Sequence, residues 1–170
     1  MKLPRIETLP ASVNLPTSKS LANRWLVLQA HYPNQVEVNS DAKSDDILVL
    51  EQALSSTENT IDVGHAGTAM RFLTAYFSQK EGAQIILTGS ERMQQRPIKP
   101  LVQVLQNFGA SIEYLGEEGF PPLRINGKTL EANAIEINGS VSSQYISALL
   151  LIAPKLKDGL NLTLKGTVVS

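Results

Sequence analysis

The sequence predicts an α/β fold of the α+β kind, built from repeated βαβαββ units. Segments with helical spacing of apolar residues alternate with short strand-like segments along the chain. The same order of elements returns after roughly 50 to 70 residues, with two helices in each unit, which is typical of stacked structural repeats. A chain of 170 residues, 42% hydrophobic and 18% charged, is long and apolar enough to form one folded core.

The first part of the chain contains the elements of one incomplete unit. A helix is expected near residues 19–31, where apolar residues follow helical spacing, and a short strand at 36–38. Ser44 is in the N-cap position of a second helix, whose first turn carries two acidic residues. A strand at about 60–63 then leads into the next unit.

The cycle of elements then starts again and is completed. The expected helices lie at 67–78 and 98–108, and Gly109 stands in the C′ position of the second. The expected strands lie at 84–87, 111–114 and 123–125. A third cycle begins with a strand at 134–137, a helix at 143–153 and a strand at 160–164.

The charge balance and the rare residue types exclude several classes of function. Lys and Arg number 15 against 16 Asp and Glu, and the resulting net charge of −1 does not favour nucleic acid or an anionic membrane as partner. The chain has no cysteine and two histidines, so we expect no disulfide, no cysteine nucleophile and no metal site. The N-terminus lacks the apolar core of a signal peptide and no apolar run could span a bilayer, which predicts a cytoplasmic protein.

Four clusters of small, hydroxyl-bearing and basic residues mark the places where a strand-like segment gives way to a helix. They lie at residues 18–24, 64–71, 92–98 and 139–144. Such a junction presents free backbone N–H groups at the positive end of the helix dipole, which favours anions. Glycine allows a ligand to approach the backbone, and Lys and Arg supply charge. Four such junctions in one chain predict a ligand with several anionic groups.

In this order the four clusters resemble those of the EPSP (5-enolpyruvylshikimate-3-phosphate) synthase family. The resemblance runs from about residue 15 to the end of the chain and includes residues 44–46, Tyr114 and 121–124. It matches only the N-terminal part of the family, whose members are much longer. We therefore expect a fragment in which residues 15–170 form an incomplete N-terminal domain of about two and a half repeat units, with helices inside and sheets outside. Residues 1–14 would be a separate segment that pairs with a second domain.

The resemblance implies an enzyme of the shikimate pathway that transfers the enolpyruvyl group of phosphoenolpyruvate to the 5-hydroxyl of shikimate 3-phosphate. Both substrates are anionic, and basic residues at helix starts would neutralise them without a metal or cofactor. The full-length enzyme is expected to be a monomer whose partners are these two small molecules. Because the family's main proton-transferring acids lie outside the part that is matched, we do not expect this chain alone to turn over substrate.

The resemblance also assigns site residues by position. Shikimate 3-phosphate would be bound by the first and last clusters and the chain end, through Lys19, Ser20, Arg24, Ser142, Ser143, Gln144 and Ser170. Phosphoenolpyruvate would be bound by Lys19, Gly67, Arg96 and Gln144, with Lys19 as the catalytic residue that touches both substrates. Each assignment has a simpler alternative: the basic residues as solvated surface charges, the glycine as a turn residue, and the serines as helix caps.

Two residues depart from the family pattern, and two arginines are interpreted as structural. His65 stands where the family usually has Asn, and is expected to be a hydrogen-bonded structural histidine instead of an acid or base. Phe72 replaces a Pro and is expected to pack in the core. Arg71 is expected to form a buried ion pair that steadies its helix, and Arg92 to lie on the surface. The two departures bear on phosphoenolpyruvate affinity and the response to glyphosate, and not on the reaction class.

Three other functions compete with this interpretation. The sister family that transfers enolpyruvate to UDP-N-acetylglucosamine opens with a Lys-Asn pair where this chain has Lys19 and Ser20, and many of its members carry a loop cysteine. A non-catalytic anion-binding or assembly module could use the same repeat. Binding of single-stranded nucleic acid is disfavoured by the charge balance and by an aromatic content of 5%.

Overall fold

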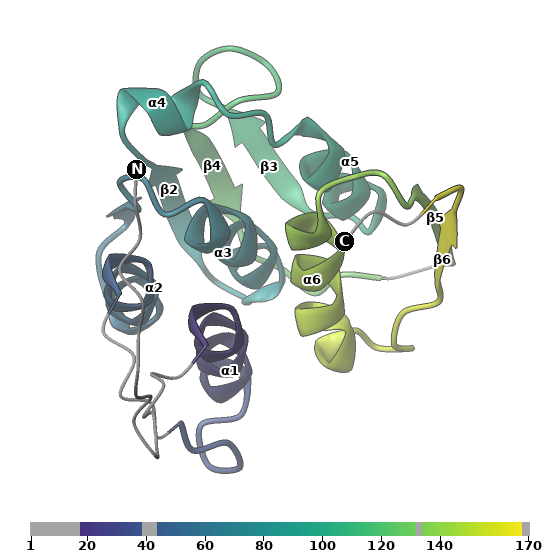
Figure 1. Ribbon diagram of the computed structural model, residues 1–170, viewed down its shortest axis with the longest axis horizontal. Helices are drawn as coiled ribbons and strands as arrows, with labels where there is room; N and C mark the ends of the chain where they lie inside the picture. Colours follow the sequence, from purple (N-terminus) through teal and green to yellow (C-terminus); the bar gives the residue numbers. More distant parts are fainter. Residues whose placement is uncertain (1–17, 39–43, 132–133, 168–170) are drawn as a thin grey trace, which may run out of the picture.

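The computed structural model describes residues 18–38, 44–131 and 134–167 (Figure 1). Its helices are α1 (Lys19–His31), α2 (Asp45–Ser55), α3 (Gly67–Gln79), α4 (Glu91–Gln94), α5 (Lys99–Asn107) and α6 (Ser143–Ile152), followed by the 3-10 turn η1 (Ala153–Lys155). Its strands are β1 (Thr60–Asp62), β2 (Gln84–Thr88), β3 (Ser111–Tyr114), β4 (Leu123–Asn126), β5 (Ile135–Asn138) and β6 (Leu162–Lys165).

The strands form two sheets whose connections repeat. The first has the order β1-β2-β4-β3, with β1 parallel to β2 and the other pairs antiparallel. The second consists of β5 parallel to β6. Residues 60–126 are therefore one complete βαβαββ unit with the short α4 added, and β5-α6-β6 repeats its first three elements. The predicted fold class is confirmed.

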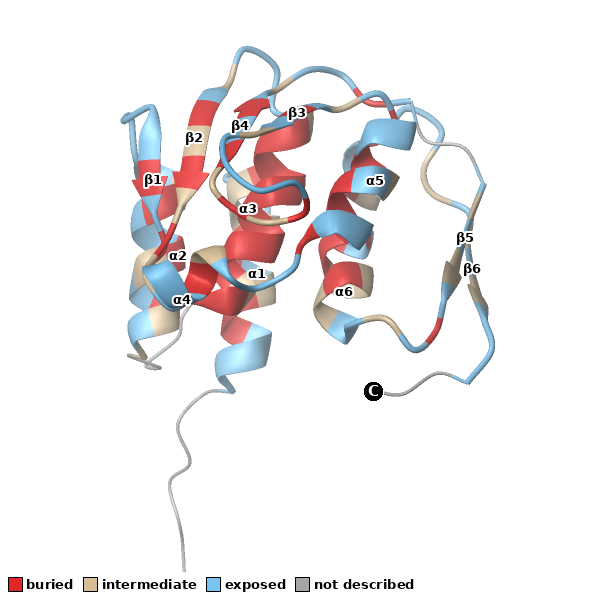
Figure 2. Cartoon of the chain, turned by 90° about the horizontal axis from the view of Figure 1, so that it is seen from above, coloured by how far each residue is buried: buried red, intermediate tan, exposed pale blue. Residues whose placement is uncertain are grey.

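Helix α3 is the centre of the core. Residues 69–78 are all buried, as expected for a helix that is covered on every side (Figure 2). Its hydroxyl groups are satisfied within the helix: Thr74 Oγ1 donates to Met70 O at 2.7 Å, and Ser78 Oγ donates to Thr74 O at 2.6 Å. Phe72 is 2% exposed, which confirms its predicted place in the core.

The first turns of α1, α3 and α6 lie at the same end of the molecule. Arg24 Nη2 in α1 donates to Ser147 Oγ in α6 at 3.1 Å. Gln144 Nε2 in α6 donates to Thr68 Oγ1 in α3 at 3.2 Å. Three helix N-termini, each with a positive partial charge, are therefore brought together.

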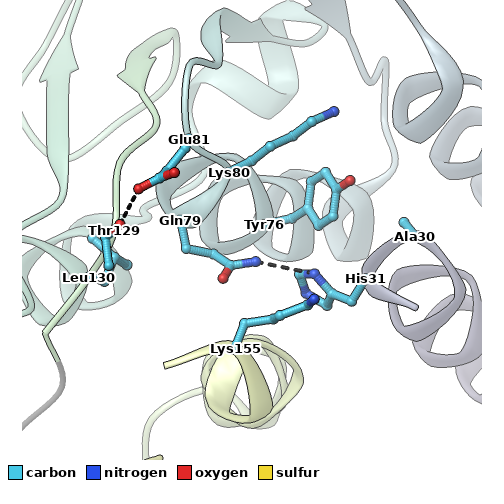
Figure 3. A pocket seen from close by; sticks show the side chains of 9 residues that line it. All are labelled: Ala30, His31, Tyr76, Gln79, Lys80, Glu81, Thr129, Leu130 and Lys155. Atoms are coloured by element: carbon cyan, nitrogen blue, oxygen red, sulfur yellow. Dashed lines mark hydrogen bonds between the residues drawn. The ribbon is translucent and has the colours of Figure 1, made fainter. Parts of the chain in front are cut away.

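The opposite ends of these helices also meet. Gln79 Nε2 at the end of α3 lies 3.1 Å from His31 Nδ1 at the end of α1. Tyr32 Oη donates to Pro154 O in η1 at 3.2 Å. Figure 3 shows His31 and Gln79 beside Lys155 at this end, so α1, α3 and α6 run in the same general direction.

Some sequence-based expectations need correction, and others fall outside the described residues. Residues 36–38 form no strand, and the short helix α4 was not predicted. Ser44 does occupy the N-cap of α2, but its side chain makes no capping hydrogen bond. Residues 1–14 and Ser170 lie outside the described ranges. No helix of those ranges is long and apolar enough to cross a membrane, and no group of three possible metal ligands occurs within them.

Candidate functional site

Apart from Ser170, which is outside the described ranges, the sequence-predicted site residues lie at the end of the molecule where the three helices begin. Lys19 is the first residue of α1, Gly67 the first of α3, and Ser142 the N-cap of α6. Arg96 lies between α4 and α5. Segments that are far apart in the sequence therefore converge here, which neither composition nor periodicity could establish.

Gly67 and Arg96 are in direct contact. A Cβ atom placed on Gly67 would lie 2.4 Å from Arg96 Nη1 and 2.7 Å from Nη2, so the guanidinium occupies the space that any side chain would need. The residue before the helix, Ala66, provides no side-chain cap for α3. No acceptor within the described ranges bonds to the first N–H groups of α3, which lie beside a guanidinium that can share the same anion.

Arg71 holds these two elements together, but not by the ion pair that was expected. Its side chain is 4% exposed and donates to Gly67 O at 3.1 Å and to Pro97 O at 3.2 Å, and no carboxylate within the described ranges forms a salt bridge with it. Pro97 O also accepts from Tyr145 Oη at 2.6 Å. Burial lowers the pKa of Arg71, and the positive charge of Arg96 lowers it further. Arg71 and Arg96 are therefore two neighbouring cations at the site that no carboxylate of the described ranges pairs with.

The start of α6 combines a cap with a contact to α3. Ser142 Oγ accepts from Gln144 N at 3.4 Å, so this serine occupies the helix N-cap that the simpler interpretation assigned to it. Its neighbour Ser143 is exposed. The side chain of Gln144 reaches Thr68 and so lies against the first turn of α3. A capping serine keeps a lone pair and its hydroxyl proton, so capping and anion binding are compatible.

The first cluster lies beside α6. Arg24 is half-buried, with Nη1 donating to Ser20 O at 2.8 Å and Nη2 bound to Ser147. This fixes the guanidinium between α1 and α6, contrary to the interpretation of a freely solvated charge. Lys19 Nζ lies 3.1 Å from Asp46 Oδ2, with 53% of the lysine side chain exposed. Such an exposed pair contributes little stability, and Lys19 can turn to a ligand at small cost.

A hollow of about 430 Å³ opens next to Gly67, and we call it the arginine hollow. It is lined by His65, Arg92, Met93 and Arg96. Arg92 is exposed, as expected from the sequence, and its place in the lining beside Arg96 was not predicted. His65 Nδ1 lies 2.8 Å from Ser90 Oγ, which confirms the expected hydrogen-bonded histidine.

A second hollow of about 450 Å³ lies at the other end of the helices (Figure 3). Lys80 and Lys155 contribute two positive charges, whereas Glu81 and the two helix C-termini contribute about two negative ones, so the net charge is close to zero. Burial, and to a smaller extent Lys155, lowers the pKa of His31 to about 4, so its ring is neutral. The arginine hollow, with two guanidiniums and a helix N-terminus beside it, has a charge of about +2.5 and is the better anion site.

Comparisons with known proteins agree with this geometry. A family model described as EPSP synthase (3-phosphoshikimate 1-carboxyvinyltransferase) matches residues 49–170. A 3-phosphoshikimate 1-carboxyvinyltransferase of Bacteroides fragilis (strain YCH46) is 51% identical over 162 residues, which cover 95% of this chain and 39% of that protein. One from Shewanella woodyi is 38% identical, covering 100% of this chain and 46% of the relative. The chain thus spans less than half the length of these curated relatives.

The same family appears among solved structures. An EPSP synthase from Acinetobacter baumannii superposes with a TM-score of 0.70 over 83% of this chain and 38% of that chain. At 23% sequence identity this similarity supports the fold alone. The relationship to this family rests on the sequence matches, and these confirm the resemblance seen in the four clusters.

Proposed function

We propose that this chain, which belongs to the EPSP synthase (3-phosphoshikimate 1-carboxyvinyltransferase) family, forms part of a site that transfers enolpyruvate from phosphoenolpyruvate to shikimate 3-phosphate. The 5-hydroxyl of shikimate 3-phosphate gives up its proton to a base as its oxygen bonds to C2 of phosphoenolpyruvate, and a proton is added at C3. The tetrahedral intermediate then loses inorganic phosphate and a C3 proton, which restores the carbon–carbon double bond.

The observation that carries this proposal is the convergence of Gly67, Arg96 and Gln144. Arg96 lies against Gly67, and Gln144 bonds to Thr68, the next residue of α3. Residues from three separate clusters therefore lie around one set of N–H groups that have no acceptor in the described part of the chain. A site that binds two anionic substrates side by side needs donors from several elements in this arrangement.

The two substrates would occupy adjacent parts of the site. Phosphoenolpyruvate would take the Gly67 and Arg96 side, where backbone N–H groups and a guanidinium are close together. Shikimate 3-phosphate would take the α1 and α6 side, bound by Ser20, Arg24, Ser142 and Ser143. Lys19 and Gln144 would lie at the boundary between the substrates.

These side chains are mostly donors and cations, which stabilise negative charge but do not remove protons. The carboxylate near them, Asp46, is paired with Lys19. The proton transfers would therefore depend on acids from another part of the full-length protein. The proposal extends to a cytoplasmic, monomeric enzyme whose partners are the two small anions, without nucleic acid or membrane.

The first test is an NMR chemical-shift titration of the chain with shikimate 3-phosphate, with UDP-N-acetylglucosamine and inorganic phosphate as comparison ligands. We expect saturable shifts that cluster on Lys19, Arg24 and Ser142 to Gln144. Arg24→Ala should weaken binding at least about tenfold because it removes a charge-assisted contact, and Ser142→Ala should weaken it less.

The matched control is Arg124→Ala, because Arg124 is an exposed arginine whose Nη1 pairs with Glu113 at 2.6 Å in the sheet. It should leave the affinity unchanged. Saturation by the UDP-sugar alone would favour the sister family. Equal affinity for shikimate 3-phosphate and inorganic phosphate would favour a non-catalytic anion-binding module, and no response to any ligand would contradict a binding site on this chain.

A further inference from the structure

The arginine hollow contains two side chains that the family resemblance does not assign to any ligand. Arg92 was expected on the surface, and His65 was expected to have a structural role. Both line the same hollow as Arg96, the residue expected to bind phosphoenolpyruvate. Arg96 therefore shares the hollow with two further potential hydrogen-bond donors, Arg92 and His65.

The walls of the hollow are fixed by the backbone. Ser90 N donates to Gly64 O at 3.1 Å, which ties the segment before α4 to the segment before α3. A Cβ atom on Gly89 would lie 2.8 Å from the same Gly64 O, so these segments are in close contact. Met93 is 1% exposed and forms the floor of the hollow. His65 and Arg92 thus extend from a tightly packed frame.

The hydrogen bonds of Ser90 bear on the tautomer of His65. Ser90 Oγ accepts from Met93 N at 3.3 Å, and it lies 2.8 Å from His65 Nδ1. With one lone pair engaged by the Met93 N–H, the hydroxyl can either donate its proton to Nδ1 or accept from Nδ1 with its second lone pair. In the tautomer in which the hydroxyl donates, the neutral ring carries its own proton on Nε2. No residue of the described ranges bonds to Nε2, so it remains free to donate to a ligand.

The charges of the hollow have one sign. Arg92 and Arg96 form no salt bridge with any carboxylate of the described ranges, and no carboxylate lines the hollow. Two guanidinium groups and an imidazole N–H present donors and no acceptor. A tetrahedral oxyanion, with several acceptor oxygens pointing in different directions, matches donors that come from separate positions better than a planar carboxylate does.

Building on the proposed function, we propose that Arg92 and His65 bind the phosphate group of phosphoenolpyruvate together with Arg96, and so determine affinity for this substrate. Ser90 is the positioning residue that orients the His65 ring.

The test is calorimetric titration of the chain with phosphoenolpyruvate, inorganic phosphate and pyruvate, which lacks the phosphate group. Arg92→Gln and His65→Gln should each weaken binding of phosphoenolpyruvate and of phosphate by about five- to thirtyfold. The control Arg124→Gln should stay within about twofold of the parent chain. Binding of pyruvate should be the same in all four proteins.

The comparison of ligands separates a contact with the phosphate group from a structural role. A lost contact weakens the binding of phosphoenolpyruvate and phosphate but not of pyruvate, whereas a structural defect weakens the binding of all three ligands. Affinities of both variants within about twofold of the parent, or equal losses for pyruvate, would overturn the proposal. A parent chain that binds shikimate 3-phosphate but not phosphoenolpyruvate would overturn it and leave the other half of the proposed site intact. Binding of neither substrate would overturn both.

Discussion

Replacement of Gly67 by alanine should separate the stability of the fold from the affinity of the site. Gly67 does not have a positive φ, so alanine fits its backbone conformation. At the start of a helix alanine is as good as glycine or better, by about 0 to 1 kcal/mol. The free energy of unfolding should therefore be unchanged or slightly increased.

The substitution should weaken ligand binding because it displaces the side chain of Arg96. The new methyl group would lie 2.4 Å from Nη1, whereas ordinary contacts begin at 3.4 Å, so the guanidinium must move by about 1 Å. Arg96 is exposed and flexible, and this movement costs little stability. It does misalign a charge-assisted contact to the ligand, for which we estimate a loss of about 1 to 2 kcal/mol, or about five- to thirtyfold in Kd for phosphoenolpyruvate.

Urea unfolding and calorimetric titration of the same Gly67→Ala preparation measure the two effects. The matched control is Gly116→Ala, because a Cβ atom on Gly116 meets nothing closer than Pro122 Cδ at 3.9 Å. The control should change neither quantity. An unchanged Kd for Gly67→Ala would refute the placement of phosphoenolpyruvate beside Arg96. A loss of stability above about 2 kcal/mol would refute the inference that the arginine can move aside.

Two further predictions concern stability. Gly127→Ala should destabilise the fold by more than about 3 kcal/mol in urea unfolding. Its Cβ would lie 1.9 Å from Lys80 O and 2.5 Å from Phe77 O, and this backbone cannot move aside. A stable variant would contradict the packing at the end of α3. Burial and the nearby Lys155 lower the pKa of His31 from 6.5 to about 4, so the unfolded chain takes up the proton first and stability falls as the pH drops from 6.5 towards 4. The loss at pH 5 relative to pH 8 should be about 2 kcal/mol by urea unfolding, and His31→Asn should abolish that part of the pH dependence.

Elements with a strong local signal could be predicted from the sequence to within one or two residues. The helix expected at 67–78 is α3 (Gly67–Gln79), and the strand expected at 111–114 is β3. The strand expected at 36–38 was wrong, because a strand exists only where a partner strand is in reach, and three apolar-polar-apolar residues do not specify a partner. Helix α4 has four residues and depends on the cap from Ser90, which is too short a pattern for periodicity to reveal.

The candidate site shows the same division between local and distant information. The clusters and their helix starts could be read from residue types, because capping and charge are local properties. The partners of Arg71 could not, since they are carbonyl groups of residues 67 and 97, and nothing local indicates that these meet. The expected ion pair followed from the usual rule for buried arginines, and the fold satisfied the guanidinium with backbone oxygens instead.

The cations at this end of the molecule link ligand binding to folding. Arg71 is buried without a carboxylate partner among the residues that the structure describes, and Arg96 stands close enough to lower its pKa, so the folded chain holds two positive charges together that the unfolded chain keeps apart. A bound anion offsets this repulsion, whereas the unfolded chain has no assembled site to bind it. The ligand should therefore raise the free energy of unfolding, by about 2.7 kcal/mol at a concentration of 100 Kd. The repulsion depends on the distance between Arg96 and Arg71. In Gly67→Ala the new methyl group displaces the Arg96 guanidinium, so both the repulsion and the increase in the free energy of unfolding on anion binding should be smaller.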